Sequence, residues 1–426
     1  MPEGHDFRSL QRRRVYLGEG LSFEVLRRDR RLDAEAVDLT SEGLGLAITH
    51  GDAPAVGERV RVRPVGRGAT DTALPALVRH VGRVRDLTRI GLALIGDGSP
   101  ARDTQFDCPE GQPAFATASC PWFFGEHLRF RIVRAGAEGV TLRAARPAPA
   151  LLGGMELELD LQFAFAAAVR VRGRVTTVRR PYIGVAWDAP SPALHEALAD
   201  YLLSADTTLT PARLRAGGVR VGSVERVVSY GYATSAGEHE EILALRLLAH
   251  KTSGHLEAAS IADLRSPFDA HARHLTCRFG GRIVGYVRVI FVDGEPTRSQ
   301  YVSWGGHEVP RWLWDAGFVE AGAGAMHPDF QRAGLFVALM QHAVRVAVQS
   351  GHRYVLGACD DELLAMYAAM GFELLEERMV EPRPGWRFRS HLIVLDAERL
   401  LAAPPATPTL AAMASAAGFA GMRAAA

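Results

Sequence analysis

Short runs of alternating apolar and polar residues dominate the first two hundred positions of the chain. The runs at residues 38–48 and 76–94 are matched by similar runs at residues 136–144 and 168–187, and each is bounded by Gly or Pro. Alternation with a period of two is typical of antiparallel strands that bury one face. Each copy is about a hundred residues long, which suits a small β-barrel. The pattern therefore predicts two small antiparallel barrels in tandem.

Beyond the second barrel the periodicity changes. Runs with helical spacing, such as residues 240–252 and 362–370, alternate with apolar runs such as residues 282–291 and 319–326. This is the order of a mixed α/β unit. A Gly-, Arg- and Thr-rich stretch before it is interpreted as a linker, and the Ala- and Pro-rich end of the chain as a disordered tail. The predicted boundaries are residues 1–106 and 107–206 for the barrels, 207–238 for the linker, 239–400 for the α/β unit and 401–426 for the tail.

Composition narrows the class of protein. The formal net charge of +1 gives no global attraction to nucleic acid or to a membrane surface. The four cysteines form no C-x-x-C pair, so neither a disulfide framework nor a zinc site is expected. No uninterrupted apolar run is long enough to span a bilayer. We expect a protein of the bacterial cytoplasm that has no metal, no transmembrane segment and no nucleic-acid partner.

An arginine-rich segment precedes the first barrel, and a polar turn lies within the barrel. The segment at residues 8–14 reads RSLQRRR, and the turn at residues 38–43 reads DLTSEG. A guanidinium pairs with phosphate through two hydrogen bonds, and its fork can meet the O6 and N7 atoms of guanine. The turn offers a carboxylate, a hydroxyl and backbone N–H groups. The two segments could therefore close over a compact, doubly anionic guanine nucleotide.

These segments resemble the two marks of the PilZ family of cyclic di-GMP receptors, R-x-x-x-R and [D/N]-x-S-x-x-G. Threonine stands where the family usually has serine, and the likeness covers residues 7–96. The alternative is a solvated basic tail beside an ordinary hairpin turn. The second copy lacks the arginine pair and is interpreted as a degenerate, structural copy. The resemblance implies cyclic di-GMP as a regulatory ligand, bound by Arg8, Arg12, Arg13, Asp38, Thr40 and Gly43.

A Gly-containing turn joins a strand-like run to a helix-like run at residues 331–336, QRAGLF. Backbone N–H groups at a helix N-terminus are unpaired and can hold a pyrophosphate or a phosphodiester. The turn resembles the [Q/R]-x-x-G-x-[G/A] motif of the GNAT (Gcn5-related) acyltransferase fold, although Phe336 departs from its last position. Residues 367–372, YAAMGF, match the Y-x-x-x-G-F ending of the same fold. Phe336 could pack beside a pantetheine arm or turn into the helix core.

Residues 240–395 resemble the GNAT branch that contains N-acyl amino acid synthases and acyl-homoserine-lactone synthases. The likeness implies an acyl donor, acyl-ACP (acyl carrier protein) or acyl-CoA, and a small amine acceptor resembling an amino acid. An arginine often found after the strand glutamate is absent, which leaves acceptor recognition open. The implied donor-binding residues are Met326, His327, Gln331, Arg332, Ala333, Gly334 and Leu335, and the acceptor-binding candidates are Arg246, Asp269 and Arg288.

Two residues are candidates for proton transfer. Glu320 on a central strand could act as the base, directly or through a water, because burial raises the pKa of a carboxylate. Tyr367 could donate a proton to the leaving sulfur. A backbone N–H near Met326 and His327 could hold the carbonyl oxygen. The alternatives are a surface position for Glu320, a packing role for Tyr367, and an ion pair of Arg246 with Asp263 or Asp269.

The sequence therefore predicts two small antiparallel PilZ-like barrels followed by a mixed α/β GNAT-like domain. The predicted function is a cyclic di-GMP-responsive N-acyltransferase that uses a carrier-protein or coenzyme A thioester. Acyl carrier protein is a candidate partner, beside cyclic di-GMP and the amine acceptor. The alternative is a non-catalytic cyclic di-GMP effector whose GNAT-like unit serves as an interaction platform.

Overall fold

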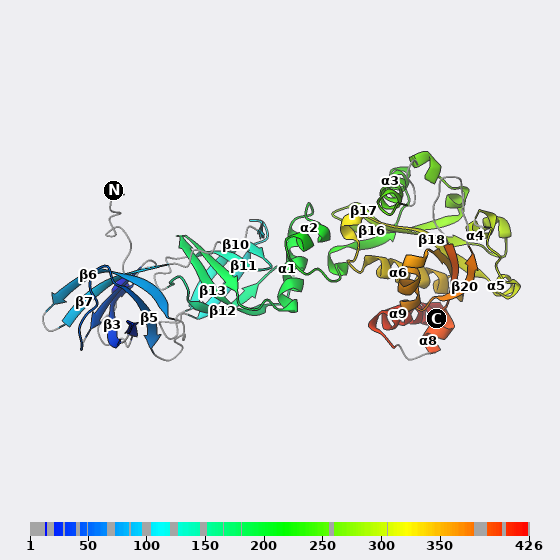
Figure 1. The fold of residues 1–426 in the computed structure, drawn as a ribbon. Coiled ribbons are helices and arrows are strands. Elements are labelled where there is room, and N and C mark those ends of the chain that lie inside the picture. The colour runs from blue at the N-terminus through cyan, green and yellow to red at the C-terminus, as the bar shows by residue number, and fades with distance from the viewer. Residues whose placement is uncertain are drawn as a thin grey trace. The chain divides into compact units, whose positions relative to one another are not determined.

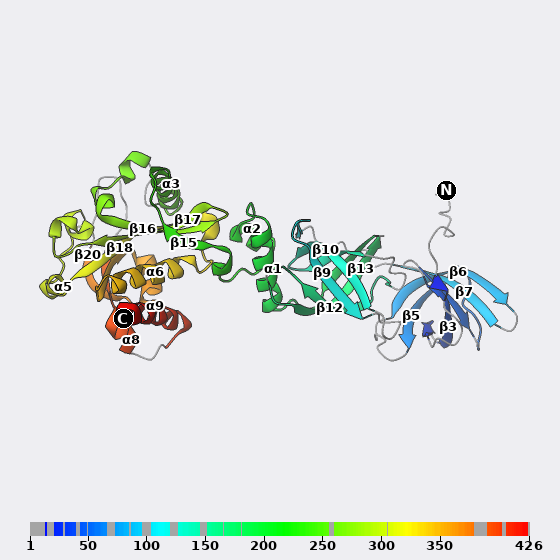
Figure 2. The ribbon, with the colours of Figure 1, turned by 180° about the vertical axis from the view of Figure 1, so that it is seen from behind.

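The computed structural model of the 426-residue chain divides into two compact units (Figures 1 and 2). One comprises Met1–Leu209 with Leu214–Arg220, and the other Thr210–Arg213 with Val221–Ala426. Among the residues described, no helix combines the length and apolar composition needed to cross a bilayer. The structure describes residues 13–14, 21–28, 30–39, 43–48, 50–65, 73–84, 87–95, 104–119, 127–144, 151–164, 166–179, 181–254, 260–304, 306–378, 390–402 and 406–424.

The first barrel is a ring of six antiparallel strands, drawn in blue in Figure 1. The ring closes because β3 pairs with both β2 and β4, and the short β1 adds to the end of β3. Alternate residues face inward, as Val25, Leu46 and Ile90 do. The strands are β1 Arg13–Arg14, β2 Ser22–Leu26, β3 Arg31–Leu39, β4 Gly43–Ile48, β5 Arg59–Val65, β6 Leu74–Val84 and β7 Leu87–Leu94.

The second barrel repeats this topology strand for strand. β10 pairs with both β9 and β11 and closes a six-strand ring, while β8 adds to the end of β10 as β1 does to β3. Helices α1, Pro192–Ala205, and α2, Pro211–Ala216, follow. The strands are β8 Gln105–Asp107, β9 Ala114–Ser119, β10 His127–Gly136, β11 Gly139–Ala144, β12 Glu156–Gln162, β13 Val169–Arg179 and β14 Tyr182–Trp187.

Matching irregularities confirm the internal repeat. A bulge interrupts β3–β4 between Ala36 and Asp38, and another interrupts β10–β11 between Ile132 and Arg134. Gly43 and Gly139 each approach the neighbouring strand so closely that an added Cβ would overlap a carbonyl oxygen, of Leu92 and Val185 respectively. A larger residue would push these strands apart, so both copies need glycine there. The predicted tandem of barrels is confirmed.

The C-terminal unit is a mixed sheet with helices on both faces. Its order is β15-β16-β17-β18-β19-β21-β20, and only β18–β19 is parallel among the pairings described. Figures 1 and 2 show α3 above the sheet and α6 below it. The strands are β15 Ser229–Tyr232, β16 Ala272–Phe279, β17 Arg282–Phe291, β18 Phe318–Met326, β19 Tyr354–Cys359, β20 Glu373–Arg378 and β21 Ser390–Asp396. The helices are α3 Ala236–Thr252, α4 Gln300–Ser303, α5 Arg311–Ala316, α6 Leu335–Gln349, α7 Asp361–Ala369, α8 Ala397–Ala402 and α9 Pro408–Ala424, with 3₁₀ turns at Glu225–Val227 (η2), Ile261–Leu264 (η3), Pro267–His271 (η4), Pro296–Arg298 (η5) and Pro328–Phe330 (η6).

Two boundary regions differ from the sequence prediction. The stretch interpreted as a linker contributes β15, which pairs with β16 at the edge of the sheet. The stretch interpreted as a disordered tail contains α9, a helix that packs on α6 and buries Met413, Ala416 and Ala417. Alanine is the best helix former, and Pro408 stands in the first turn, where proline is tolerated. The expectation of disorder there is therefore wrong.

Candidate functional site

The two parallel strands at the centre of the sheet separate part-way along their length. Three residue pairs join these strands, and the last of them is Glu320 with Leu356. A bulge between β17 and β18 and a left-handed backbone at Ala323 (φ 52°) bend β18 away from its neighbour. Residues of both strands beyond this point line a cavity of about 630 Å³. The splayed strands leave backbone groups open to a ligand.

The turn before α6 lies on one side of this cavity. Gln331 and Arg332 line it, and Met326 at the end of β18 joins them. Arg332 and Gly334 both have left-handed backbones (φ 58° and 78°), which turn the chain so that α6 begins beside the cavity. The N–H groups of the first helical turn have no partners within the helix and attract anions. The turn is thus built as sequence analysis predicted.

Other residues predicted for this turn face away from the cavity. Ala333 and Leu335 are buried, and the Ala333 carbonyl accepts a hydrogen bond from the N–H of Val224 at 3.2 Å. The N–H of His327 donates to the Val284 carbonyl at 2.8 Å. That N–H is occupied, so its predicted use as a donor to a substrate carbonyl is wrong.

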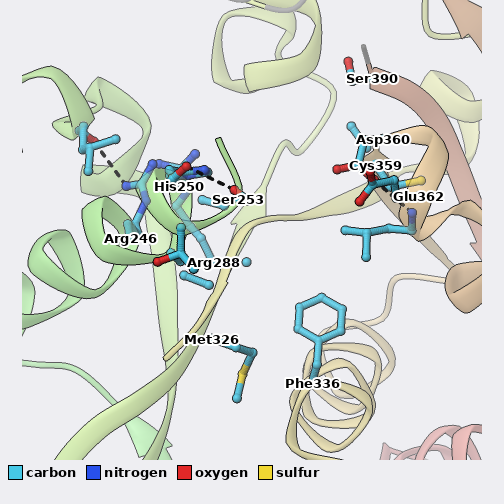
Figure 3. A pocket seen from close by; sticks show the side chains of 18 of the residues that line it. Arg246, His250, Ser253, Arg288, Met326, Phe336, Cys359, Asp360, Glu362 and Ser390 are labelled. Atoms are coloured by element: carbon cyan, nitrogen blue, oxygen red, sulfur yellow. Dashed lines mark hydrogen bonds between the residues drawn. The ribbon is translucent and has the colours of Figure 1, made fainter. Parts of the chain in front are cut away.

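Phe336 forms part of the cavity wall. Its ring meets Tyr367 edge-on, with centroids 5.9 Å apart. A Cβ added at Gly324 on β18 would lie only 2.9 Å from the ring. The phenyl group therefore fits because the strand opposite offers glycine. Figure 3 shows it projecting from α6 into the cavity, so the ring is not hidden in the helix core.

A basic wall faces the splayed strands. Arg246 from α3 and Arg288 from β17 both line the cavity and are almost fully buried. Arg246 donates to the Leu264 carbonyl at 3.2 Å. Arg288 pairs with the carboxylate of Asp269, and its Nε has no hydrogen-bond partner among the described residues. Figure 3 shows this basic wall opposite Asp360 and Glu362. A buried guanidinium with a donor to spare suits a carboxylate ligand.

Asp269 does not line the cavity but positions Arg288. Its carboxylate accepts from the Arg288 guanidinium and from the Ser266 N–H, at 3.2 Å for the latter. The ring of His274 is engaged on both nitrogens, by the Tyr286 hydroxyl at 2.9 Å and the Asp269 carbonyl at 3.1 Å. No group of three or more His, Cys, Asp or Glu among the described residues is placed to hold a metal.

Glu320 is a buried carboxylate just behind the cavity wall. It is 1 % exposed, so the alternative of a surface position is wrong. The Ser299 hydroxyl and the Gln300 N–H donate to its two oxygens, the latter at 2.9 Å. Burial raises the pKa of Glu320 to about 7, against the effect of these hydrogen bonds. Gln300 itself lines the cavity, so one residue separates the carboxylate from the cavity.

Tyr367 lies beside the cavity, between the rings of Phe336 and Phe372. Burial raises the pKa of its hydroxyl well above the ordinary value, so it carries its proton at neutral pH. Cys359 at the end of β19 lines the cavity, and burial raises the pKa of its thiol to about 11. A protonated thiol is a poor nucleophile, so Cys359 serves as a wall residue of the cavity.

The predicted nucleotide site of the first barrel is described only in part. Arg8, Arg12 and Thr40 lie outside the described residues. The backbone of β1 pairs with β3, with Arg13 opposite Leu39 and Arg14 opposite Asp38. The Asp38 carboxylate pairs with Arg89 of β7, an arginine that sequence analysis missed.

Sequence analysis also missed a polar cluster of which two members, His307 and Ser390, line the cavity. His307 contacts both Glu376 and Ser390, and these three residues come from three separate segments. The partners of His307 lie 69 and 83 positions away along the chain. No local motif marks such a group, because only the fold brings it together.

Comparison with known proteins bears on the C-terminal unit. Residues 244–394 match the family model of the N-acyl amino acid synthase FeeM. This unit is a FeeM-like N-acyltransferase domain of the GNAT fold. No curated protein matches the chain.

Solved structures similar to this chain include FeeM from uncultured soil microbes, with 12 % identity, a TM-score of 0.30 and coverage of 40 % of this chain and 90 % of that one. A GNAT-family acetyltransferase from Elizabethkingia anophelis with acetyl-CoA bound has 14 % identity, a TM-score of 0.28 and coverage of 40 % and 99 %. An acyl-CoA N-acyltransferase from Pseudomonas aeruginosa has 19 % identity, a TM-score of 0.29 and coverage of 39 % and 99 %. The cavity, the turn before α6 and the basic wall all lie within the FeeM-like domain.

Proposed function

We propose that the FeeM-like domain transfers an acyl group from a thioester to the amine of an acceptor that carries a carboxylate. The observation that carries the acceptor class is Arg288, which is 1 % exposed, lines the cavity and keeps one N–H donor without a protein partner. A buried cation with an unused donor favours an anionic ligand group. Arg246 lies in the same wall and adds a second positive charge.

The donor enters between the splayed strands. A pantetheine arm would lie along Ala323–Met326, where β18 has left β19, and its phosphate would meet the first turn of α6 beside Arg332. Coenzyme A and an acyl carrier protein both present this arm, so either can serve as donor. Phe336 narrows the channel next to the arm and excludes water from the thioester.

Two protons must move during transfer. The ammonium of the acceptor loses one before attack, and Glu320 receives it by way of the wall that contains Gln300. The thiolate that leaves takes one from Tyr367, whose hydroxyl carries its proton at neutral pH. The acyl carbon changes partner from sulfur to nitrogen. The second proton that the nitrogen loses after attack restores the Tyr367 hydroxyl, and the products are an amide and a free thiol.

Mass spectrometry of the reaction products tests this function. The full chain is incubated with acyl-CoA or with acyl-loaded carrier protein, and with matched pairs of amino acids and their carboxamides. We expect N-acyl amino acids from the acids and at least ten times less product from the carboxamides. Glu320→Gln should form product slowly while binding the donor as before. Equal yields from acids and carboxamides would contradict the carboxylate-binding role of Arg288.

We further propose that cyclic di-GMP binds the first barrel and regulates transfer. The support is the pairing of β1 with the end of β3, which sets the backbone of Arg13 and Arg14 opposite Leu39 and Asp38. Isothermal titration of cyclic di-GMP should show binding by the wild type and none by Arg8→Ala/Arg12→Ala. Arg59→Ala, an exposed arginine on β5, is the matched control. Equal affinity in the double variant would end this assignment.

A further inference from the structure

Three side chains, two of them in the cavity wall and the third behind it, are arranged as a relay. The Ser390 hydroxyl lies 2.9 Å from Nε2 of His307, and Nδ1 of the same ring lies 3.1 Å from Oε2 of Glu376. Ser390 and His307 are 5 % and 3 % exposed, yet both line the cavity of the FeeM-like domain. A nucleophile, a base and a group that orients the base thus lie next to one another in that order.

The carboxylate determines how the protons are placed. An ionised Glu376 can only accept hydrogen bonds, so Nδ1 of His307 carries the imidazole proton. Nε2 is then an acceptor, and the Ser390 hydroxyl must be its donor. The Glu308 N–H also donates to Glu376 at 3.3 Å and helps to hold it. This arrangement prepares a serine to lose its proton to histidine, as in serine hydrolases on unrelated folds.

The serine lies beside the place where the sheet opens. It begins β21, and the next residue, His391, pairs with Cys359 at the end of β19. Figure 3 shows Ser390 next to Cys359 and Asp360, across the cavity from the basic wall. An acyl group that enters between β18 and β19 therefore shares one cavity with the hydroxyl. The N-acyl transfer described above uses none of these three residues.

We propose that Ser390 is a second reactive centre, a nucleophile for acyl esters and thioesters that is activated by His307 and oriented through Glu376. The serine oxygen attacks the acyl carbon, and its proton passes to Nε2. The bond to the leaving thiol or alcohol breaks, and that group takes the proton from His307. The result is an acyl-serine. Water then adds by the same route in reverse, releasing a carboxylic acid and restoring the hydroxyl.

This activity shares its acyl substrate class with the proposed function but needs no amine acceptor. The two can therefore fail separately. When the acceptor site is empty, the acyl group on Ser390 would be hydrolysed. The domain would then act as a hydrolase as well as a transferase. In this relay His307 acts as base and then acid, and Glu376 is a positioning residue that does not touch the acyl group.

Covalent labelling is the direct test. The full chain is treated with a fluorophosphonate probe, digested and analysed by mass spectrometry. In the wild type we expect the adduct on the peptide that contains Ser390. Ser390→Ala should form no adduct, and Ser253→Ala should form the same adduct as the wild type. Ser253 is the matched control because it lines the same cavity but donates to the His250 carbonyl, at 3.1 Å. An unlabelled Ser390 in the folded wild type would overturn the proposal without any variant.

Hydrolysis of p-nitrophenyl octanoate without an amine measures the turnover. We expect Ser390→Ala and His307→Gln to lose about 100-fold or more in rate, the usual effect of removing a nucleophile or its base. Glu376→Gln should lower the pH needed for half-maximal labelling, because the protonated His307 loses its counterion, or flatten the profile, which a merely structural role would not do. Hydrolysis by Ser390→Ala at the wild-type rate would show that the reaction occurs elsewhere and would refute the assignment.

Discussion

Two arginine–aspartate pairs in this chain have the same chemistry and opposite surroundings. Arg288 and Asp269 meet in the FeeM-like domain, where the arginine side chain is 1 % exposed. Arg89 and Asp38 meet in the first barrel, where the arginine side chain is 40 % exposed. Water therefore reaches the second pair from the arginine side, and the first pair only from the side of Asp269, whose side chain is 27 % exposed. A charge kept out of water is costly to fold, so the buried arginine is the better indicator of a binding site.

The largest effect is expected at the buried arginine. Arg288→Gln should lower kcat/KM for a carboxylate-bearing acceptor about 100-fold, because a buried charged partner of the carboxylate is lost. The carboxamide counterpart should lose much less. Product formation over a range of acceptor concentrations gives both values. Arg353→Gln, which removes a surface arginine paired with Asp396, is the control and should leave both unchanged.

Glu320 is a buried acid whose hydrogen-bond donors, a hydroxyl and a backbone N–H, are neutral, whereas Asp269 and Asp38 each face an arginine. Its folded pKa of about 7 is above the ordinary value of about 4.3 in an unfolded chain. Folding therefore favours the protonated acid. The stability that this contributes is complete below about pH 4 and is lost as the pH rises through 7, by up to about 4 kcal/mol. Chemical unfolding at pH 5 and pH 8 should show this loss in the wild type and not in Glu320→Gln.

The activity of Glu320 should depend on pH in the opposite direction. A base works only when deprotonated, so kcat for acyl transfer should rise with pH through about 7. A flat profile over that range would remove Glu320 from the proton path while leaving the stability prediction intact.

Asp269→Asn sharpens the contrast between the pairs. The substitution leaves a buried guanidinium without its counterion, so we expect the free energy of unfolding to fall by about 2 kcal/mol. Denaturant titration measures it. A loss below 0.5 kcal/mol (roughly the level of an exposed pair) would mean that Arg288 has another anion beside it in the folded protein.

The smallest effect on stability is expected at Asp38. Asp38→Asn should change the free energy of unfolding by less than about 1 kcal/mol, since its partner Arg89 is well exposed. The same variant should abolish cyclic di-GMP binding in isothermal titration if the proposed sensor role holds. A large loss of stability with unchanged nucleotide affinity would reverse the roles that we give to the two pairs.

The repeat and the order of the α/β unit could be predicted because both depend on local patterns. Alternation identified the barrels, and Gly43 and Gly139 marked equivalent close approaches of strands. The residue at the bulge differs between the two copies, although their strands match. Arg134 occupies the bulge position in the second barrel that Asp38 occupies in the first, so the second barrel lacks the carboxylate there.

Other features depend on contacts that no local pattern encodes. The expected role of the His327 N–H failed because Val284, on the neighbouring strand, already accepts its hydrogen bond. The position of the Phe336 ring was left open by the motif, and Gly324 on the opposite strand decides it. Ser390, His307 and Glu376 are adjacent only after the sheet has formed.

Helix α9 has a practical consequence for anyone who divides this chain into fragments. A cut at residue 400, where composition suggests that order ends, would strip Met413 and its neighbours from the underside of α6. The same α6 begins at the turn for which we propose phosphate binding. Such a fragment would expose apolar residues of α6 to water and destabilise the turn from which that helix begins. Low solubility or weak donor binding of the fragment would then result from the cut.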